Sequence, residues 1–182
     1  MLNWFSQSPQ SDSVVITGAS TGIGAACALA LDKLGYRVFA GVRHPADGER
    51  LQQQAGPRLM PIRLDVTDAA SISAASHTVA AMVGERGLAG LVNNAGIGVA
   101  GPIELLPLAD WRRQFEVNVF GLIAVTQTFL PLIRTGRGRI INMGSIAGRA
   151  SMPFMAPYAA SKHALEAITD ALRLELQPWG IR

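Results

Sequence analysis

The chain has 182 residues, of which 49% are hydrophobic and 16% are charged, a composition that predicts one globular domain and excludes an intrinsically disordered chain. The formal net charge is +3, but the basic residues are scattered, so no nucleic-acid-binding surface is expected. The single cysteine, Cys27, cannot form an internal disulfide, and the histidines have no metal-ligand spacing, so no metal site is expected.

No stretch reaches the roughly 18–20 uninterrupted apolar residues that a membrane span needs. The best candidate, residues 120–133, is too short and contains polar residues and Pro131. Residues 1–13 have neither a basic start nor a long apolar core, so we expect no signal peptide. The default expectation is a cytoplasmic protein.

Short β-rich runs alternate with helical patterns along the whole chain. In chain order the pattern predicts a strand at 14–18, a helix at 22–34, a strand at 37–42, a helix at 51–55, a strand at 59–64, a helix at 68–83, a strand at 88–93, a helix at 107–134, a strand at 139–144 and a helix at 158–176. Pro61 places the third strand at a sheet edge, and Asp68 is a good N-cap. The 107–134 helix is expected to break near Asn118 or Gly121.

Strands that alternate with helices predict βαβ units and therefore a parallel sheet. Right-handed crossovers then give an α/β fold with a doubly wound, Rossmann-like sheet between two helical layers. No repeat, low-complexity segment or linker interrupts the sequence. Residues 1–182 are therefore expected to form a single domain.

A glycine-rich turn follows the first predicted strand and opens the first helix: Thr17-Gly18-Ala19-Ser20-Thr21-Gly22-Ile23-Gly24. Gly18 lets the chain turn sharply, Gly22 lets the backbone approach a pyrophosphate, and Gly24 allows close helix–strand packing. The free N–H groups and the positive dipole end of the helix favour phosphates. The turn predicts a dinucleotide site; a tight βα turn without a ligand is the alternative.

Further motifs follow in order. Asn93-Asn94-Ala95-Gly96 closes the fourth strand, Asn118-Val119-Phe120-Gly121 lies in the long helix, and Ser145 follows the fifth strand, where parallel sheets bind ligands. Tyr158 and Lys162 are four residues apart and share one helix face. With these motifs, from about residue 13 to its end, the chain resembles the short-chain dehydrogenase/reductase family. Segments 38–43 and 101–104 resemble its steroid and retinol dehydrogenase side.

A tyrosine with a pKa of about 10 is too weak an acid for proton exchange at neutral pH, but a neighbouring ammonium lowers that value. Tyr158 and Lys162 therefore make a plausible general acid/base pair, and Ser145 can donate to a substrate oxygen. The resemblance implies that Tyr158 exchanges the proton while hydride passes between nicotinamide and a carbonyl/alcohol carbon. It implies that Lys162 also holds the nicotinamide ribose and that Asn118 completes the catalytic set.

The cofactor preference is predicted from the end of the second strand. The acidic residue that would accept hydrogen bonds from the ribose of NAD falls on Val42, which cannot do so, and Arg43 follows. A guanidinium can clamp a 2′-phosphate, so NADP(H) is the expected cofactor. The resemblance further implies adenosine contacts from Asp65 and Val66 and from the backbone of Asn94, Ala95 and Gly96.

The resemblance also implies additional C-terminal strands and a substrate loop, which the sequence does not contain, so we expect a fragment or a truncated product. Residues 148–157 carry Met152, Phe154 and Met155 and are expected to line an apolar pocket mouth that suits a hydrophobic ketone or alcohol. The apolar helices at 120–132 and 164–176 predict a homodimer or homotetramer. A non-catalytic NADP-binding regulator or an inactive fragment is the first alternative. A nucleotide-sugar epimerase is the second, disfavoured by the glycine spacing.

Overall fold

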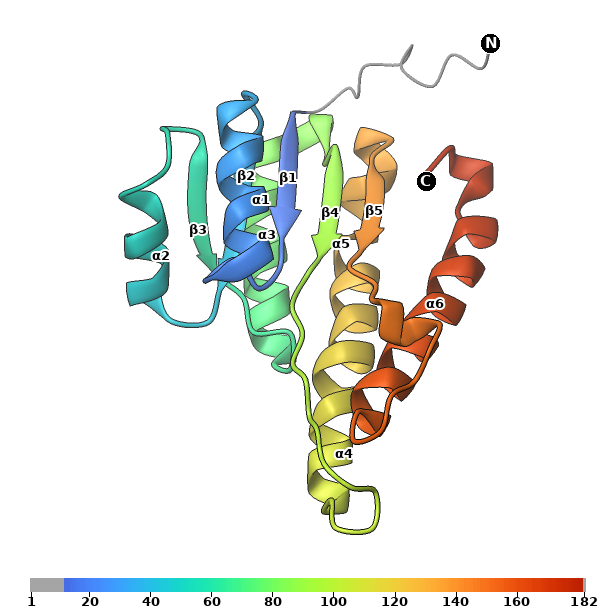
Figure 1. Cartoon of the computed structure of the whole chain (residues 1–182). Helices are drawn as coiled ribbons and strands as arrows, with labels where there is room; N and C mark the ends of the chain where they lie inside the picture. Colours follow the sequence, from blue (N-terminus) through green and yellow to red (C-terminus); the bar gives the residue numbers. More distant parts are fainter. Residues whose placement is uncertain (1–11, 182) are drawn as a thin grey trace.

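The structure, a computed structural model, describes residues 12–181, which form a five-stranded parallel sheet flanked by helices (Figure 1). The strand order is β3-β2-β1-β4-β5. The strands are β1 (Ser13–Ile16), β2 (Arg37–Val42), β3 (Leu59–Arg63), β4 (Gly90–Asn93) and β5 (Arg139–Asn142). The predicted doubly wound sheet is confirmed, and its order reverses between β1 and β4, where such sheets bind ligands. The expectation of no signal peptide falls almost entirely outside the described residues.

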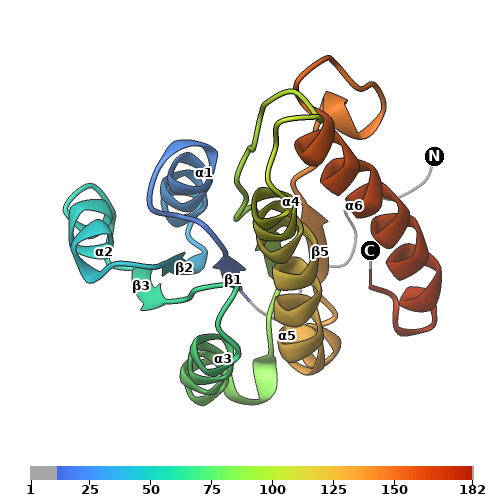
Figure 2. The ribbon, with the colours of Figure 1, turned by 90° about the horizontal axis from the view of Figure 1, so that it is seen from below.

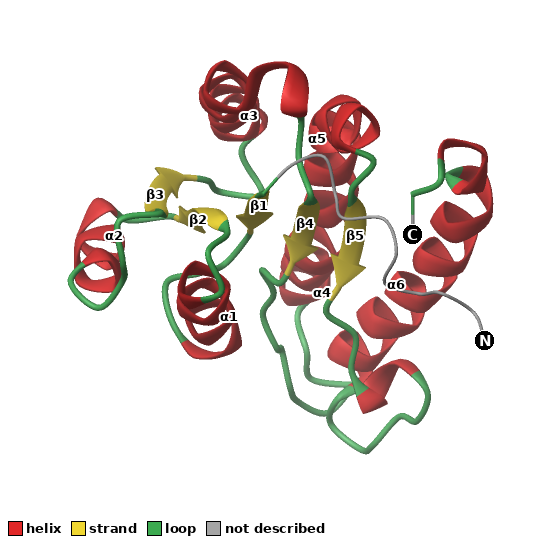
Figure 3. Ribbon diagram, turned by 90° about the horizontal axis from the view of Figure 1, so that it is seen from above, coloured by secondary structure: helices red, strands yellow, loops and turns green. Residues whose placement is uncertain are grey.

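Helices cover both faces of the sheet. Figures 2 and 3 show α1 on one face and α3 and α5 on the opposite face, with α6 beyond the β5 edge. The α-helices are α1 (Gly22–Lys33), α2 (Pro45–Gln52), α3 (Ala69–Val83), α4 (Leu108–Phe115), α5 (Leu122–Gly136) and α6 (Ala156–Glu175). Shorter helical segments are η1 (Gly84–Arg86), η2 (Glu116–Gly121), η3 (Ile146–Gly148) and η4 (Gln177–Trp179).

The core consists of two clusters, one on each face, because successive strand residues point to opposite sides. In β1, Val15 packs with α3 and α5, whereas Val14 and Ile16 pack with α1 and α2. Every residue of β1 is buried, as expected of a central parallel strand. Phe39 and Phe129 are the largest fully buried side chains, and burying each stabilises the fold by about 1.5–3 kcal/mol.

Two local predictions are confirmed and one is wrong. Pro61 lies in β3 at the edge of the described sheet, and Asp68 caps α3 by accepting hydrogen bonds from two first-turn N–H groups. The helix predicted at 51–55 is instead α2, Pro45–Gln52. Pro45 starts it because its fixed φ suits the first helical position. Because Gly48 has no side chain, α2 packs closely on Pro61. A Cβ on Gly48 would lie 2.7 Å from the Pro61 Cβ atom.

The helix predicted at 107–134 was expected to break near Asn118 or Gly121, but it is continuous from Leu108 to Gly136 and is only distorted there. Residues 116–121 form a π-helical segment, η2, between α4 and α5, a distortion that is frequent at functional sites. A Cβ on Gly121 would lie 2.8 Å from the Val66 carbonyl oxygen, so glycine lets the helix approach the end of β3. By length and composition alone, the stretch Leu108–Gly136 would suffice to cross a membrane. In the structure, its residues Val125, Phe129 and Ile133 are fully buried in the core cluster that contains Val15 of β1.

Candidate active site

The glycine turn is shaped by close backbone contacts. Gly18 has a φ of 65°, and a Cβ there would lie 2.7 Å from the Ala95 Cα atom. A Cβ on Gly24 would lie 2.3 Å from the Gly18 carbonyl oxygen. Gly22 has a φ of 59°, and a Cβ there would have no other atom within 4 Å. Gly18 and Gly24 are therefore required for packing, whereas Gly22 leaves open space beside the first turn of α1.

Thr17 and Asn94 fasten this turn to the end of β4. The Thr17 Oγ1 atom accepts hydrogen bonds from the N–H groups of Asn94 and Ala95, each 3.0 Å long. The Asn94 side-chain amide donates to the carbonyl oxygens of Thr17 and Gly18, each at 3.0 Å. The Asn94 side chain thus holds the turn in place. The cofactor contact predicted at Asn94 involves its backbone.

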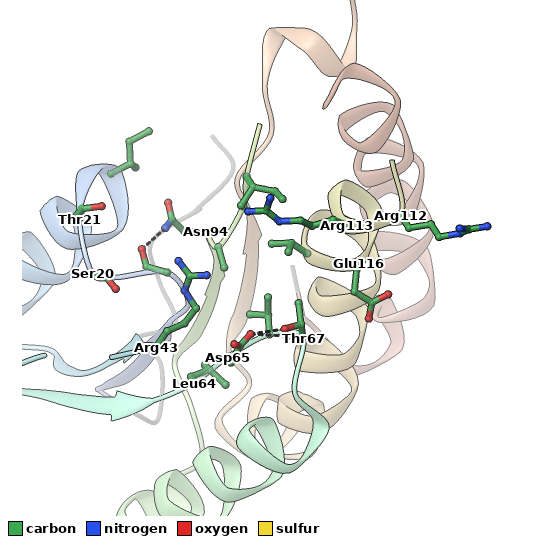
Figure 4. Close-up of a pocket in the computed structure, with 18 residues that line it drawn as sticks. Ser20, Thr21, Arg43, Leu64, Asp65, Thr67, Asn94, Arg112, Arg113 and Glu116 are labelled. Atoms are coloured by element: carbon green, nitrogen blue, oxygen red, sulfur yellow. Dashed lines mark hydrogen bonds between the residues drawn. The ribbon is translucent and has the colours of Figure 1, made fainter. Parts of the chain in front are cut away.

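A cavity of about 710 Å³ opens at the carboxyl ends of β1, β2, β3 and β4 (Figure 4). Ten of the predicted cofactor residues line it: Gly18, Ser20, Thr21, Ile23, Arg43, Asp65, Val66, Asn94, Ala95 and Gly96. Thr21, the N-cap of α1, makes no side-chain capping hydrogen bond. The N–H groups of the first turn of α1 are therefore not capped by that side chain. This cavity, with an uncapped helix start at its wall, fits a dinucleotide with its pyrophosphate at α1.

One end of the cavity carries the charged pair Arg43 and Asp65, at the ends of β2 and β3 (Figure 4). Burial acts to raise the pKa of the Asp65 carboxyl, but hydrogen bonds from Thr67 and the positive charges of Arg43 and Arg63 outweigh it and lower the pKa. Thr67 donates from both its N–H group (3.0 Å) and its hydroxyl (2.8 Å) to Asp65 Oδ1. Asp65 is therefore an ionised acceptor that Thr67 fixes in the part of the cavity wall where Arg43 lies.

The α4–η2 helix supplies a wall that the sequence motifs did not predict. Arg112, Arg113 and Glu116 line the cavity. Figure 4 shows the Arg113 side chain directed toward the side where Arg43 and Asn94 lie, and Arg112 directed away. Nothing in the local sequence distinguishes these arginines from surface residues of an amphipathic helix, because their position depends on how the helix packs.

Of the predicted catalytic residues, Ser145, Tyr158 and Lys162 lie on the segments after β5, and Asn118 lies in η2 before it. Lys162, on the second turn of α6, is only 7% exposed, and its Nζ atom donates to the Met143 carbonyl oxygen at 2.6 Å. That Nζ atom lies 5.8 Å from the centre of the Tyr158 ring. Burial lowers the pKa of the Lys162 ammonium, and the Glu166 carboxylate partly offsets this. Ser145 is the N-cap of η3, and its Oγ atom accepts a hydrogen bond from the Ala147 N–H group at 3.1 Å.

Asn118 is buried at the junction of three segments. Its side chain pairs with both backbone groups of Ile97, at 2.9 and 3.0 Å, and donates to Ser161 Oγ at 3.1 Å. Gln114, one turn earlier and fully buried, accepts from Val99 N–H at 2.7 Å and donates to the Ile97 carbonyl at 2.8 Å. These two amides hold the segment after β4 against α6, next to Lys162.

The structure thus separates the predicted site into two adjoining parts. Most predicted cofactor residues line the cavity, whereas Ser145, Tyr158 and Lys162 do not belong to its wall. A Cβ on Gly98 would lie 3.8 Å from the Tyr158 ring, so the segment that leaves the cavity after Gly96 leads to Tyr158. Gln114 and Ser161 were missed; the four-residue spacing of Gln114 and Asn118 was the one available signal. Among the described residues, no cluster of His, Cys, Asp or Glu could hold a metal ion.

Comparisons with known proteins agree with this geometry. A family model described as short chain dehydrogenase matches residues 12–182. Human 17-beta-hydroxysteroid dehydrogenase type 2 is 41% identical over 172 residues, which cover 93% of this chain and 44% of the relative. Mouse retinol dehydrogenase 5 is 42% identical over 176 residues, 96% of this chain and 55% of the relative. The chain therefore spans about half the length of the curated relatives it matches.

Solved structures share the fold. A gluconate 5-dehydrogenase from Burkholderia cenocepacia in complex with NADP and tartrate has a TM-score of 0.84 at 30% identity, over 93% of this chain and 68% of that chain. An NAD+-bound xylitol dehydrogenase has a TM-score of 0.88 at 30% identity, over 96% and 68% of the two chains. The glycine turn, the cavity and these matches lead to one conclusion: the chain belongs to the short-chain dehydrogenase family, on its steroid and retinol dehydrogenase side.

Proposed function

We propose that the protein is an NADP(H)-dependent oxidoreductase that transfers a hydride between nicotinamide and a hydrophobic ketone or alcohol. The observation that carries the proposal is the arrangement of two parts: a dinucleotide-sized cavity bounded by Arg43, and the buried Lys162 with Tyr158 beside it. The relatives named above are steroid and retinol dehydrogenases. One similar structure holds NADP and another holds NAD+, so the preference rests on Arg43.

In this account the uncapped first turn of α1 binds the pyrophosphate through its N–H groups. Arg43 forms charge-assisted hydrogen bonds to the 2′-phosphate, and Asp65 with Val66 bounds the adenine end of the cavity. Val42 is buried and apolar, so no carboxylate from this position repels that phosphate. When bound, the nicotinamide supplies the hydride chemistry, and the protein supplies orientation and proton handling.

The proton chemistry belongs to Tyr158. In this account the Lys162 ammonium stabilises negative charge that develops on the Tyr158 oxygen while the proton is exchanged. Ser145 donates a hydrogen bond to the substrate oxygen as negative charge develops there. Asn118 fixes the segment after β4 and the start of α6 relative to each other, through Ile97 and Ser161.

The hydrophobic substrate is proposed from the rim beside Tyr158. Met152 and Phe154 are exposed on the segment before α6, and Ile103 and Leu105 are exposed on the segment after β4. The two segments are joined by a hydrogen bond of 2.7 Å from the Gly101 N–H group to the Phe154 carbonyl oxygen. Such apolar side chains suit a substrate with a large apolar body.

The test is turnover of hydrophobic ketones with NADPH by the purified chain, with Tyr158→Phe as the matched control. The proposal expects oxidation of NADPH that Tyr158→Phe reduces by at least about 100-fold, the size of a general-acid contribution, while NADPH binding is unchanged. Binding without turnover in both proteins would favour a non-catalytic NADP-binding regulator. Equal turnover in both would remove Tyr158 from the mechanism.

A further inference from the structure

Glu166 lies one helical turn after Lys162 on α6, so both side chains are on the same face of the helix. Its carboxylate forms an ion pair with Arg149, which follows η3, with 3.2 Å between Arg149 Nη2 and Glu166 Oε2. The proposed mechanism uses Ser145, Tyr158 and Lys162 and leaves this carboxylate without a role.

The Glu166 side chain also fills the space between the two glycines that flank Ser145. A Cβ on Gly144 would lie 3.0 Å from Glu166 Oε1, and one on Gly148 would lie 3.1 Å from Glu166 Cγ. The same Gly148 Cβ would lie 3.0 Å from the Lys162 carbonyl oxygen. The segment that carries Ser145 therefore packs directly on the part of α6 that carries Lys162 and Glu166.

Lys162 needs a counter-charge. Its ammonium is buried, and the hydrogen-bond acceptor it contacts is the neutral Met143 carbonyl. Burial of an ammonium favours loss of its proton, so it lowers the pKa of Lys162, whereas the Glu166 carboxylate raises it. A neutral Lys162 would no longer stabilise negative charge on the Tyr158 oxygen during proton exchange.

The other charged groups around this part of α6 are accounted for. Elements packed on α6 include η3, η2, α4 and η4, and β5 contacts it through the hydrogen bond from Asn142 to Thr169. The α4 helix carries Asp110 in its first turn, and β5 begins with the exposed Arg139. Arg149 faces Glu166 from the end of η3, while Glu116 of η2 and the arginines of α4 line the cofactor cavity. The η4 segment carries no charged residue. Asp170, the next carboxylate along α6, pairs with Arg173 at 3.2 Å.

We propose that Glu166 is a positioning residue, which holds the Ser145 segment against α6 and supplies the counter-charge that keeps Lys162 protonated. The purpose of this role depends on the proposed oxidoreductase function. The titration that tests the role follows the protonation of Lys162 and does not depend on that function. Glu166 acts through Lys162 and through the backbone at Gly144 and Gly148, and it does not contact the reacting atoms.

The chain has two lysines, Lys33 and Lys162, so the signal of each can be followed separately. The test therefore measures protonation directly and needs no enzymatic activity. In the full 182-residue chain labelled with 13C-lysine, the two ε-carbon signals are followed by NMR as the pH rises. Lys33 is exposed and serves as the internal reference, and Lys162 is expected to titrate at a lower pH. Glu166→Gln is expected to lower the Lys162 midpoint further, because it removes the carboxylate that raises it.

Asp170→Asn is the matched control, since it removes one carboxylate from the same helix and is expected to leave the Lys162 midpoint in place. An unchanged midpoint in Glu166→Gln, or an equal shift in Asp170→Asn, would overturn the proposal. Arg149→Gln covers the case in which Glu166→Gln does not fold. It frees the carboxylate from its guanidinium partner and is expected to raise the midpoint, and no rise would also overturn the proposal.

A kinetic measurement then connects the charge to turnover. In Glu166→Gln, the pH at which kcat falls on the alkaline side is expected to move down together with the NMR midpoint, and Glu166→Asp, which keeps the charge, is expected to restore it. A kcat profile that stays in place while the NMR midpoint moves would overturn the catalytic purpose of Glu166. If no chain turns over any substrate, the proposed function fails while the NMR titration still decides whether Glu166 controls Lys162.

Discussion

Thr17 and Asn94 bind each other's backbone: the Thr17 hydroxyl oxygen accepts from the Asn94 N–H group, and the Asn94 side-chain amide donates to the Thr17 carbonyl, each at 3.0 Å. The pair joins the ends of the two central strands, β1 and β4, at the point where the strand order reverses. Because the glycine turn begins one residue later, the position of the whole phosphate-binding segment depends on this pair.

Asn94→Ala is therefore expected to destabilise the fold, because it leaves the carbonyl groups of Thr17 and Gly18 without their donor. The expected cost is about 1–3 kcal/mol in the free energy of unfolding, measured by urea denaturation. A double-mutant cycle with Thr17→Val should give a coupling energy of about 0.5–3 kcal/mol, as for residues in contact. Strictly additive effects would show that the two side chains do not act together.

The glycines of the turn are expected to differ in what they tolerate. Gly24→Ala places a methyl group 2.3 Å from the Gly18 carbonyl oxygen, so it should lower stability by at least about 1–3 kcal/mol, as overpacking does. Gly22→Ala meets no atom within 4 Å and should cost only the roughly 1–2 kcal/mol of a left-handed backbone. Its larger effect should fall on dinucleotide affinity, measured by fluorescence titration. A Gly24→Ala protein more stable than Gly22→Ala would contradict the packing.

The hydrogen bonds from Thr67 make the Asp65 carboxyl sensitive to mutation. The folded-state pKa of Asp65 lies below the ordinary value of 3.8, so its contribution to stability is present above the unfolded pKa and is lost as the pH falls through the folded one. Thr67→Val removes the hydroxyl donor and should raise the pKa of Asp65, measured by NMR titration of its carboxyl carbon. It should also lower stability at pH 7 while leaving stability nearly unchanged at a pH below both the folded and the unfolded pKa.

Thr78→Val is the control for that experiment. Thr78 also donates from its hydroxyl, but to the Ala74 carbonyl within α3, and it contacts no carboxylate. The Asp65 pKa should be the same in Thr78→Val and in the unmodified protein. An Asp65 pKa that does not respond to Thr67→Val would mean that the Thr67 hydroxyl contributes nothing and that the backbone N–H group of residue 67 and the charges of Arg43 and Arg63 lower the pKa.

The parts of the fold and site that the sequence predicted are those that depend on local chemistry. The glycine turn and the Asp68 cap are each specified by neighbouring residues, and the alternation of strands and helices predicts the sheet. Helix α2 was misplaced because Pro45 and Gly48 begin it without an apolar repeat. Its position depends on contact with Pro61, which sequence spacing does not show.

The missed site residues depend on contacts between distant segments. Gln114 holds Ile97 and Val99, and Glu166 contacts Gly144 and Arg149, only because α4 and α6 pack beside loops that follow β4 and β5. Arg113 reaches the cavity because of the direction of α4 (Figure 4). None of these residues forms part of a short motif, so their roles follow from the tertiary structure.

The most direct test of the account is a fluorescence titration of the 182-residue chain with NADPH and NADH, repeated with Arg43→Ala. The account predicts that the unmodified chain binds NADPH more tightly than NADH. Arg43→Ala should weaken NADPH binding by about 10-fold or more, the loss expected for a charge-assisted hydrogen bond of roughly 1.5–3 kcal/mol, and leave NADH binding unchanged. Equal affinity for both cofactors, or an equal loss of both in Arg43→Ala, would contradict the assignment of Arg43 to the 2′-phosphate.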